Sequence, residues 1–449
     1  MRRIVLSSAF SCVAMAMLTA CGGDDTEVPL DGGNAPADAG PDVTVVTNDS
    51  GPDAEPDAAD ATSASDAAED APDAADAAPS GPGFLLVSYA FDEFQKSELD
   101  AVNLATGQTA GRFSYGSGGT NVATSTHPWV LEQFNDVVAR MNPAQPWMPL
   151  STWNVASRAP DAGGYAYGNA YSVAENASSA YVALYNRNHV PVLDTSVAVD
   201  GGAPASSIDL SSLLQPGDGD GSVEDTAAIY DPSTKRVWLV LGNIDELTVA
   251  PPSYDLLCVP SLKSTVVAID TTTNTLVSGL KYELTGVNPT SVQFDAPNER
   301  LIIMSAGCNR APDAGSDAGP GALEGRLIEQ IDLNTGISTV LYEATTQPYP
   351  GQLAYVQPHL AFVSFGSSTY AWDPTLTVLG APIANAPEAW VWNGTGLLGP
   401  HTTYLADGGV SNSIVSVNPL TGEATIVEPS PFSVEDPSGY VEGIGLWNP

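Results

Sequence analysis

One short turn recurs seven times along this chain, and its spacing restricts the fold more than any other feature. In each copy an apolar run leads into Asp or Asn, whose side chain can bond its own backbone two residues further on. In the clearest copies a Gly or Asn, which tolerates positive φ, closes the turn. These are the properties of a tight turn between two antiparallel strands. The copies begin at Asn103, Asn142, Asp194, Asp270, Asp332, Asp373 and Asn418.

The intervals between successive turns are 39, 52, 76, 62, 41 and 45 residues. Short runs rich in Val, Ile, Leu, Tyr and Thr fill them, and no sustained helical periodicity appears. A unit of about 40 residues with four short strands is typical of a β-propeller blade. We therefore predict an all-β fold over residues 83–449, a seven-bladed β-propeller of four-stranded blades.

The two ends of this region complement each other. Residues 84–89 match the second strand of a blade, so the first unit has no innermost strand of its own. The run from Tyr440 to Trp447, after the last turn, has the pattern of the missing strand. We predict that this C-terminal strand closes the ring, which would leave no exposed sheet edges.

The long intervals contain insertions at 211–224, 243–263 and 306–325. In a propeller, connections at these places share one face, which we call the insertion face, and the short turns lie on the other. Cys258 and Cys308 fall in insertions of neighbouring blades, and in an oxidising compartment a disulfide between them is the default expectation. A metal-binding pair or two free thiols are the alternatives.

Residues 1–20 have the pattern of a targeting segment. Arg2 and Arg3 precede a short apolar run that ends Leu-Thr-Ala-Cys21. This ending resembles the bacterial lipobox, which implies cleavage before Cys21 and lipidation of its thiol. Gly22 and Gly23 follow, and by the enterobacterial sorting rule they imply the outer membrane. We expect an exported protein that is lipid-anchored in the cell envelope, either periplasmic or surface-exposed.

Residues 21–82 read as a disordered Ala/Asp/Pro-rich tether. Residues 24–80 contain sixteen Asp or Glu and no Lys or Arg, and almost no large apolar side chain. The whole chain has a formal net charge of −39. Such a charge argues against nucleic acid or anionic lipid surfaces as partners. We expect a monomer that contacts the membrane through its lipid and binds a protein or polysaccharide.

The blade pattern resembles the bacterial surface-layer (YVTN/YncE-like) propeller repeats. The resemblance rests on turns such as Asp231–Lys235 and Asp332–Gly336 and spans about 365 residues. It implies the fold and says little about function. The quinoprotein repeat, which is similar, expects Trp where this chain has Gly111 and Val340, and WD40 signatures are absent.

Candidate site residues come from the start of each innermost strand, because these positions would ring the mouth of the central channel. We expect no cofactor. A polar ring there nevertheless resembles the divalent-metal site of gluconolactonase-type propeller hydrolases, and this resemblance implies a Ca²⁺ ion with oxygen ligands. Those enzymes have six blades, and a hydrated polar channel is the alternative. The positions are Asn121, Asn169, Glu224, Asp225, Thr290, Gln352 and Glu388.

Two smaller patterns leave alternatives open. The segment 218–222 (Asp-Gly-Asp-Gly-Ser) has part of a Ca²⁺-loop spacing, and an acidic solvent-exposed loop is the other interpretation. Tyrosines at 165, 167, 171, 181 and 185 could stack on sugars at the insertion face or pack between blades.

No nucleophile elbow, zinc-protease motif or phosphate-binding loop occurs in the sequence. The leading interpretation is therefore a non-enzymatic binding module for protein or glycan at the insertion face. A metal-dependent hydrolase or lyase with a carboxylate ring is the alternative. A purely structural surface-layer component is a third.

Overall fold

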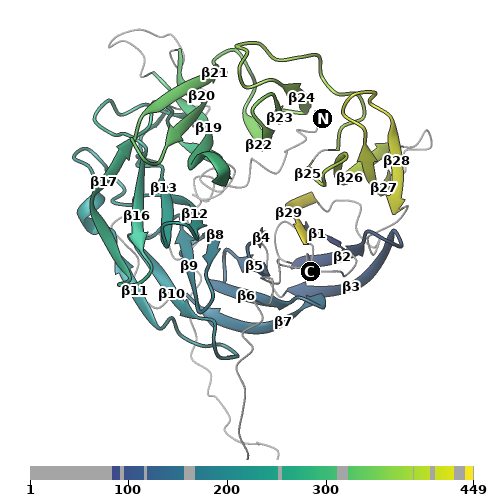
Figure 1. Cartoon of the computed structure of the whole chain (residues 1–449), viewed down its shortest axis with the longest axis horizontal. Coiled ribbons are helices and arrows are strands. Elements are labelled where there is room, and N and C mark those ends of the chain that lie inside the picture. Colours follow the sequence, from purple (N-terminus) through teal and green to yellow (C-terminus); the bar gives the residue numbers. More distant parts are fainter. Residues whose placement is uncertain are drawn as a thin grey trace, which may run out of the picture.

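Seven blades surround a central axis in the computed structural model (Figure 1). The structure describes residues 83–91, 96–115, 119–155, 167–250, 255–310, 322–387, 389–404, 410–428 and 440–447. The predicted signal peptide and tether lie outside these ranges. The predicted all-β, seven-bladed fold is confirmed; helix in the described residues amounts to the 3-10 turns Ser211–Leu213 and Ala296–Asn298.

Each blade is an antiparallel sheet whose strands run outward from the axis in pairing order. The innermost strands, by blade, are β29 (Tyr440–Trp447), β4 (Thr120–Thr124), β8 (Ala170–Glu175), β12 (Asp225–Asp231), β18 (Pro289–Asp295), β22 (Pro350–Gln357) and β25 (Val391–Trp392). The second strands are β1 (Phe84–Phe91), β5 (Pro128–Glu132), β9 (Ser179–Leu184), β13 (Arg236–Leu241), β19 (Arg300–Asn309), β23 (Leu360–Phe365) and β26 (Leu397–Tyr404).

The outer half of each blade completes the sheet. The third strands are β2 (Lys96–Asn103), β6 (Val137–Asn142), β10 (His189–Asp194), β16 (Thr265–Asp270), β20 (Leu323–Asp332), β24 (Ser368–Trp372) and β27 (Val410–Val417). The outermost strands are β3 (Gln108–Tyr115), β7 (Gln145–Asn154), β11 (Ser206–Asp209), β17 (Thr275–Glu283), β21 (Ser338–Glu343) and β28 (Ala424–Glu428). In the sixth blade the fourth position is reduced to a single bridge between Tyr370 and Pro382.

The predicted ring closure is confirmed. β29 pairs with β1 along its whole length, from Phe84 opposite Trp447 to Ala90 opposite Tyr440. The indole Nε1 of Trp447 also donates to the carbonyl of Pro143 in the second blade, at 3.1 Å. The last strand of the chain therefore completes the first blade and joins it to the next.

Packing between neighbouring blades explains why the strands are apolar on both faces. One buried cluster joins Leu86 of the first blade to Val130 and Met141 of the second. Another joins Tyr181 of the third blade to Val237 and Leu239 of the fourth. A sheet covered on both sides needs apolar residues at successive positions, as β19 shows with Leu-Ile-Ile-Met.

The repeated turns have the predicted local structure. At Asn103, Asp270 and Asp332 the side-chain Oδ1 accepts a hydrogen bond from the backbone N–H two residues on, at 2.8–2.9 Å. The closing residues are left-handed, with φ of 66° at Gly107 and 53° at Asn274. The same bond forms in the other copies, at Asn142, Asp194, Asp373 and Asn418.

Candidate functional site

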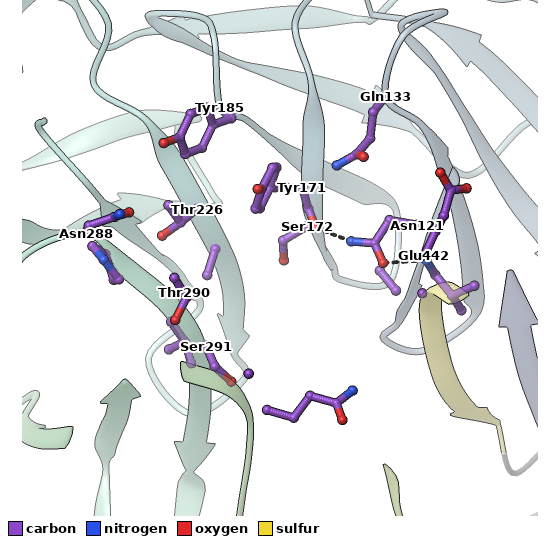
Figure 2. Close-up of a pocket in the computed structure, with 18 of the residues that line it drawn as sticks. Asn121, Gln133, Tyr171, Ser172, Tyr185, Thr226, Asn288, Thr290, Ser291 and Glu442 are labelled. Atoms are coloured by element: carbon purple, nitrogen blue, oxygen red, sulfur yellow. Dashed lines mark hydrogen bonds between the residues drawn. The ribbon is translucent and has the colours of Figure 1, made fainter. Parts of the chain in front are cut away.

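A cavity of about 540 Å³ occupies the central channel. Its wall is built from the innermost strands of the blades together with loop residues around the mouth of the channel. Figure 2 shows polar side chains from several blades pointing into this shared space. The hydroxyl, amide and carboxyl side chains of the wall are Asn121, Thr124, Gln133, Tyr171, Ser172, Tyr185, Thr226, Glu246, Asn288, Thr290, Ser291, Gln293, Tyr349, Gln352 and Glu442.

Three of the predicted site residues line this cavity: Asn121, Thr290 and Gln352. The Asn121 amide Nδ2 donates to the Tyr171 carbonyl at 3.5 Å, across the boundary between two blades. The Gln352 Oε1 accepts from the Trp390 backbone N–H at 2.7 Å. Hydrogen bonds to neighbouring blades thus orient both amides at the wall.

Asn169, Glu224 and Asp225 are not among the residues that line the cavity, and the last two are buried. Glu224 is 1% exposed, and its Oε2 accepts from the Ile244 backbone N–H at 2.8 Å. Asp225 is fully buried with no hydrogen-bond partner at either oxygen, and burial raises its pKa well above the usual range. The carboxylate ring expected at the mouth therefore does not form from these residues. Glu388 lies outside the described residues.

One backbone feature recurs at the start of the innermost strands. In four blades the residue just before the strand has a left-handed φ, at Gly119 (75°), Asn169 (56°), Glu224 (42°) and Asn288 (57°). In three of them the carbonyl accepts a backbone hydrogen bond from the residue just after the second strand, and the Asn288 carbonyl accepts one from Ala306 within β19. In the fourth blade an irregularity between Asp225 and Ala227 follows at once. This step does not by itself set the direction of the side chain, because Asn288 shares it and lines the cavity, whereas Asn169 and Glu224 do not.

Glu224 is the exception among these four left-handed residues. Gly and Asn adopt this conformation readily, whereas it is uncommon for other side chains. Strain of this kind persists only where surrounding contacts hold it. The bond from Ile244 in the 243–263 insertion is one such contact.

Two carboxyl groups that the sequence prediction missed do line the cavity, Glu246 and Glu442. Glu442 lies on the closing strand β29 at an irregularity in its pairing with β1, so strict strand alternation does not identify it. Glu246 lies in the 243–263 insertion, and no local pattern identifies it.

Glu442 links three parts of the structure. Its Oε2 accepts from the Thr120 backbone N–H at 2.8 Å and from the Ser97 hydroxyl at 3.0 Å, and its Oε1 accepts from the Gly119 backbone N–H at 3.0 Å. Burial raises the pKa of this carboxyl to about 7, against the lowering effect of these donors. The group can therefore gain or lose a proton near neutral pH.

Glu246 is held against an aromatic pair. The Tyr185 hydroxyl donates to its Oε1 at 2.9 Å, and the rings of Tyr171 and Tyr185 are stacked with centroids 5.1 Å apart. Both tyrosines line the cavity. Tyr171 and Tyr185 therefore have the position that contact with a ligand requires. Tyr181 has the other predicted role, because it is buried between blades.

The disulfide between Cys258 and Cys308 is confirmed, with a Cα–Cα distance of 5.1 Å. The Cys258 backbone N–H donates to the Asn309 carbonyl at 2.8 Å, beside the short hairpin of β14 (Val249–Ala250) and β15 (Asp255–Leu256). Val249 and Leu256 of this hairpin line the cavity. The disulfide therefore holds an insertion that forms part of the cavity wall.

The residues present do not fit the predicted Ca²⁺ site. Within the described ranges, no three His, Cys, Asp or Glu side chains are grouped so that they could hold a metal ion. Glu224 and Asp225 do not reach the cavity, as described above, so no chemistry is assigned through a metal here.

Comparisons with known proteins bear on the fold alone. No family model and no curated protein matches the chain. A protein of unknown function from Desulfotomaculum acetoxidans is similar at 11% identity with a TM-score of 0.50, over 82% of this chain and 99% of that one. A putative 6-phosphogluconolactonase from Bacteroides uniformis reaches 0.47 at 11% identity, over 81% and 99%. The periplasmic gluconolactonase of Pseudomonas aeruginosa reaches 0.41 at 12%, over 82% and 100%.

Proposed function

We propose that the propeller is a non-enzymatic binding module that holds a hydroxyl-rich ligand, such as a glycan, in the channel mouth on its insertion face. The carrying observation is the cavity of about 540 Å³, whose wall combines amide and hydroxyl side chains with the Tyr171–Tyr185 pair. Amides and hydroxyls both donate and accept hydrogen bonds, which suits a ligand covered in hydroxyl groups. Tyrosine rings add apolar surface on which a sugar ring can stack.

Direct binding measurements test this proposal. Replacing Tyr171 with Ala removes a ring from the wall, and we expect affinity for envelope glycans to fall at least about tenfold in calorimetric titration. Leu420→Ala is the matched control, because Leu420 is 88% exposed at one of the repeated turns and does not line the cavity. Undiminished binding by Tyr171→Ala, or an equal loss in the control, would contradict a site in the channel.

We propose further that the chain is exported and anchored in the cell envelope by lipid at Cys21, as a lipoprotein with surface-layer-type repeats. The support is the sequence alone, since residues 1–82 lie outside the described structure. In the described part of the chain, no helix is long and apolar enough to cross a membrane.

The anchor is testable by cell fractionation. Cys21→Ser removes the thiol that would take the lipid, and we expect the protein to move from the membrane fraction to the soluble exported fraction. Cys12→Ser, in the predicted signal segment, is the matched control. A variant lacking Cys21 that stays fully with the membrane would rule out lipid attachment there as the anchor.

One observation favours a second candidate, a hydrolase or lyase. The Glu442 carboxyl lines the cavity and has a pKa of about 7, which suits a general acid or base. Turnover of a lactone or polysaccharide by the wild-type chain, with a loss of at least about a hundredfold in Glu442→Gln, would support this candidate. Equal rates in the two proteins would remove Glu442 from any such role.

A further inference from the structure

We infer that the ligand of this cavity carries a protonated amine on its hydroxyl-rich body, as an amino sugar does. The inference rests on the proposed function and names the chemical class of the ligand. It is carried by the charges that line the cavity, by a cluster of buried carboxyl groups behind its wall, and by the aromatic pair.

The charged side chains of the cavity wall are all acidic. Glu246 and Glu442 line it, whereas no Lys, Arg or His does so among the described residues. An anionic ligand such as a sugar phosphate or a uronate would meet two carboxyl groups and no counter-charge, which disfavours its binding. An ammonium group would meet two hydrogen-bond acceptors that become more favourable as they ionise.

Further carboxyl groups stand behind Glu246. This acidic cluster consists of Asp218, Asp220, Glu224 and Asp245. The Glu246 backbone N–H donates to Asp220 Oδ2 at 2.7 Å, and the loop at Gly219 passes so close to Asp245 that an added Cβ would lie 2.9 Å from its Oδ2. Asp220 is fully buried and Asp245 is 7% exposed. The segment 218–222, for which a solvent-exposed loop was one interpretation, is thus packed against the 243–263 insertion.

Glu224 independently indicates that the acidic cluster lacks a positively charged or hydrogen-bond-donating partner. Its side chain is 1% exposed, and its Oε1 has no hydrogen-bond partner. Asp220, Glu246 and Asp218 all act on it electrostatically, so it belongs to the same cluster. A buried carboxyl oxygen without a donor is costly, and here it accompanies an uncommon left-handed backbone. A positive charge at the neighbouring cavity would offset part of that cost.

The nearby basic side chains are engaged elsewhere. The Arg187 Nη1 donates to the Asn186 carbonyl at 2.7 Å, and its charge acts on Asp136. Arg326 donates to the carbonyls of Ala306 and Gln347, each at 2.7 Å, behind the Tyr349 ring. Neither arginine lines the cavity. These two arginines therefore place no positive charge at the cavity wall, where a bound ammonium group would meet the carboxyl groups.

The aromatic pair favours the same class of ligand. Tyr171 and Tyr185 line the cavity, and Tyr185 is bonded directly to Glu246. Tyrosine faces attract cations as well as sugar rings. A carboxyl group next to an aromatic ring therefore suits an amine attached to a sugar.

Proton release gives this inference a distinctive signature. Burial and the neighbouring Asp220 raise the pKa of Asp218 to about 7, and burial raises that of Glu442 to the same value. A pKa of about 7 means that each group is partly protonated at neutral pH in the free protein. A bound cation favours the ionised forms, so binding should expel protons, and the affinity for a cation that keeps its charge, such as spermidine, should rise between about pH 6 and pH 8.

The decisive experiment is calorimetric titration of the full chain with matched oligosaccharides. The probes are a glucosamine tetramer, its N-acetylated form, a galacturonic acid tetramer and spermidine, in phosphate and in MES buffer at about pH 6, where the amines are protonated. We expect the glucosamine tetramer to bind at least about tenfold more tightly than the acetylated form and to release protons. We expect the galacturonate to bind most weakly of the three sugars.

Each other outcome identifies which idea has failed. If the acetylated tetramer binds as tightly as the amine, the inference is wrong while a glycan-binding channel stands. If spermidine binds as tightly as the glucosamine tetramer, the result supports a site for cations and contradicts the proposal that the ligand is rich in hydroxyl groups. If none of the probes binds, both ideas fail for this class of ligands.

Variants assign the charge preference to the cavity. Glu246→Gln keeps an oxygen that can accept from Tyr185 and removes the charge, so the preference for the amine should fall by at least about fivefold. Glu423→Gln, at an exposed repeated turn away from the cavity, is the matched control and should retain it. If Glu246→Gln does not fold, the wild-type salt dependence decides. Affinity for the amine must then fall as salt rises, and a flat response overturns the inference.

Discussion

A chain that ends at residue 439 is expected not to form the native ring. It lacks β29, so β1 loses its inner partner along seven paired positions. The apolar contacts of Val441, Ile444 and Leu446 with the first and seventh blades disappear as well. The bared strand β1 carries Leu85 and Val87 and would present an open sheet edge, a site for aggregation.

Thermal unfolding followed by circular dichroism, together with size-exclusion chromatography, measures this effect. We expect the cooperative transition to disappear and the truncated chain to aggregate. A separate peptide with the sequence of β29 should restore part of the transition, because the missing strand is supplied in trans. A truncated monomer that melts like the intact chain would show that the ring does not depend on this strand.

A single substitution gives a finer test of the same closure. A Cβ at Gly443 would lie 2.6 Å from Asn121 Oδ1 and 2.7 Å from the Val122 backbone nitrogen. Because one of these contacts is backbone, the clash cannot be relieved by a side-chain rotation alone. Gly443→Val should therefore lower the melting temperature, whereas a substitution at Gly279, where an added Cβ meets no atom within 4 Å, tests backbone strain without a clash.

Loss of the disulfide is the second large effect that we expect. The bond between Cys258 and Cys308 closes a loop across a sequence separation of 50 residues. The chain-entropy model then gives a stabilisation of about 4 kcal/mol, by restricting the unfolded chain. The double variant Cys258→Ser, Cys308→Ser should lose a free energy of unfolding of that order in denaturant titration.

The same variant should also weaken ligand binding, because the disulfide holds the insertion that supplies Val249 and Leu256 to the cavity wall. Treatment of the wild-type protein with a thiol reductant should reproduce both effects, whereas the double variant should not respond to the reductant. A double variant as stable as the wild type would mean that the packing of the insertion, and not the disulfide, holds it in place.

Local regularities made most of the fold predictable. The Asx turns are set by side chains within a few residues, and two-sided apolar strands indicate sheets covered on both faces. The apolar run within Arg236–Leu241 forms β13 of the fourth blade. In the sixth blade the turn at Asp373 forms, but a single bridge replaces the predicted fourth strand.

The candidate site was less predictable, because it depends on the direction of side chains at strand ends. Strict alternation of strand residues misplaces Glu224 and Asp225, which are buried away from the channel beside a left-handed step and an irregular pairing. Of the four left-handed residues, Gly119, Asn169 and Asn288 are of types that adopt this conformation readily, so only they indicate the step in the sequence. Glu246 reaches the cavity because a long insertion folds over the channel. That insertion has no sequence periodicity from which the direction of its side chains could be predicted.

The sequence by itself determined the number of blades, the closing strand and the cysteine pair, because each follows from spacing along the chain or from the oxidising setting that the N-terminus predicts. The tertiary structure alone decided which polar groups share the channel. It brings Glu442 from the last strand beside Gly119 and Thr120, and Glu246 against Tyr185 and Asp220. The physical reason is that this propeller joins its first and last strands, β1 and β29, in one blade and folds insertions over the channel. Residues that are hundreds of positions apart then share one cavity, and their burial, not their spacing, sets their charge.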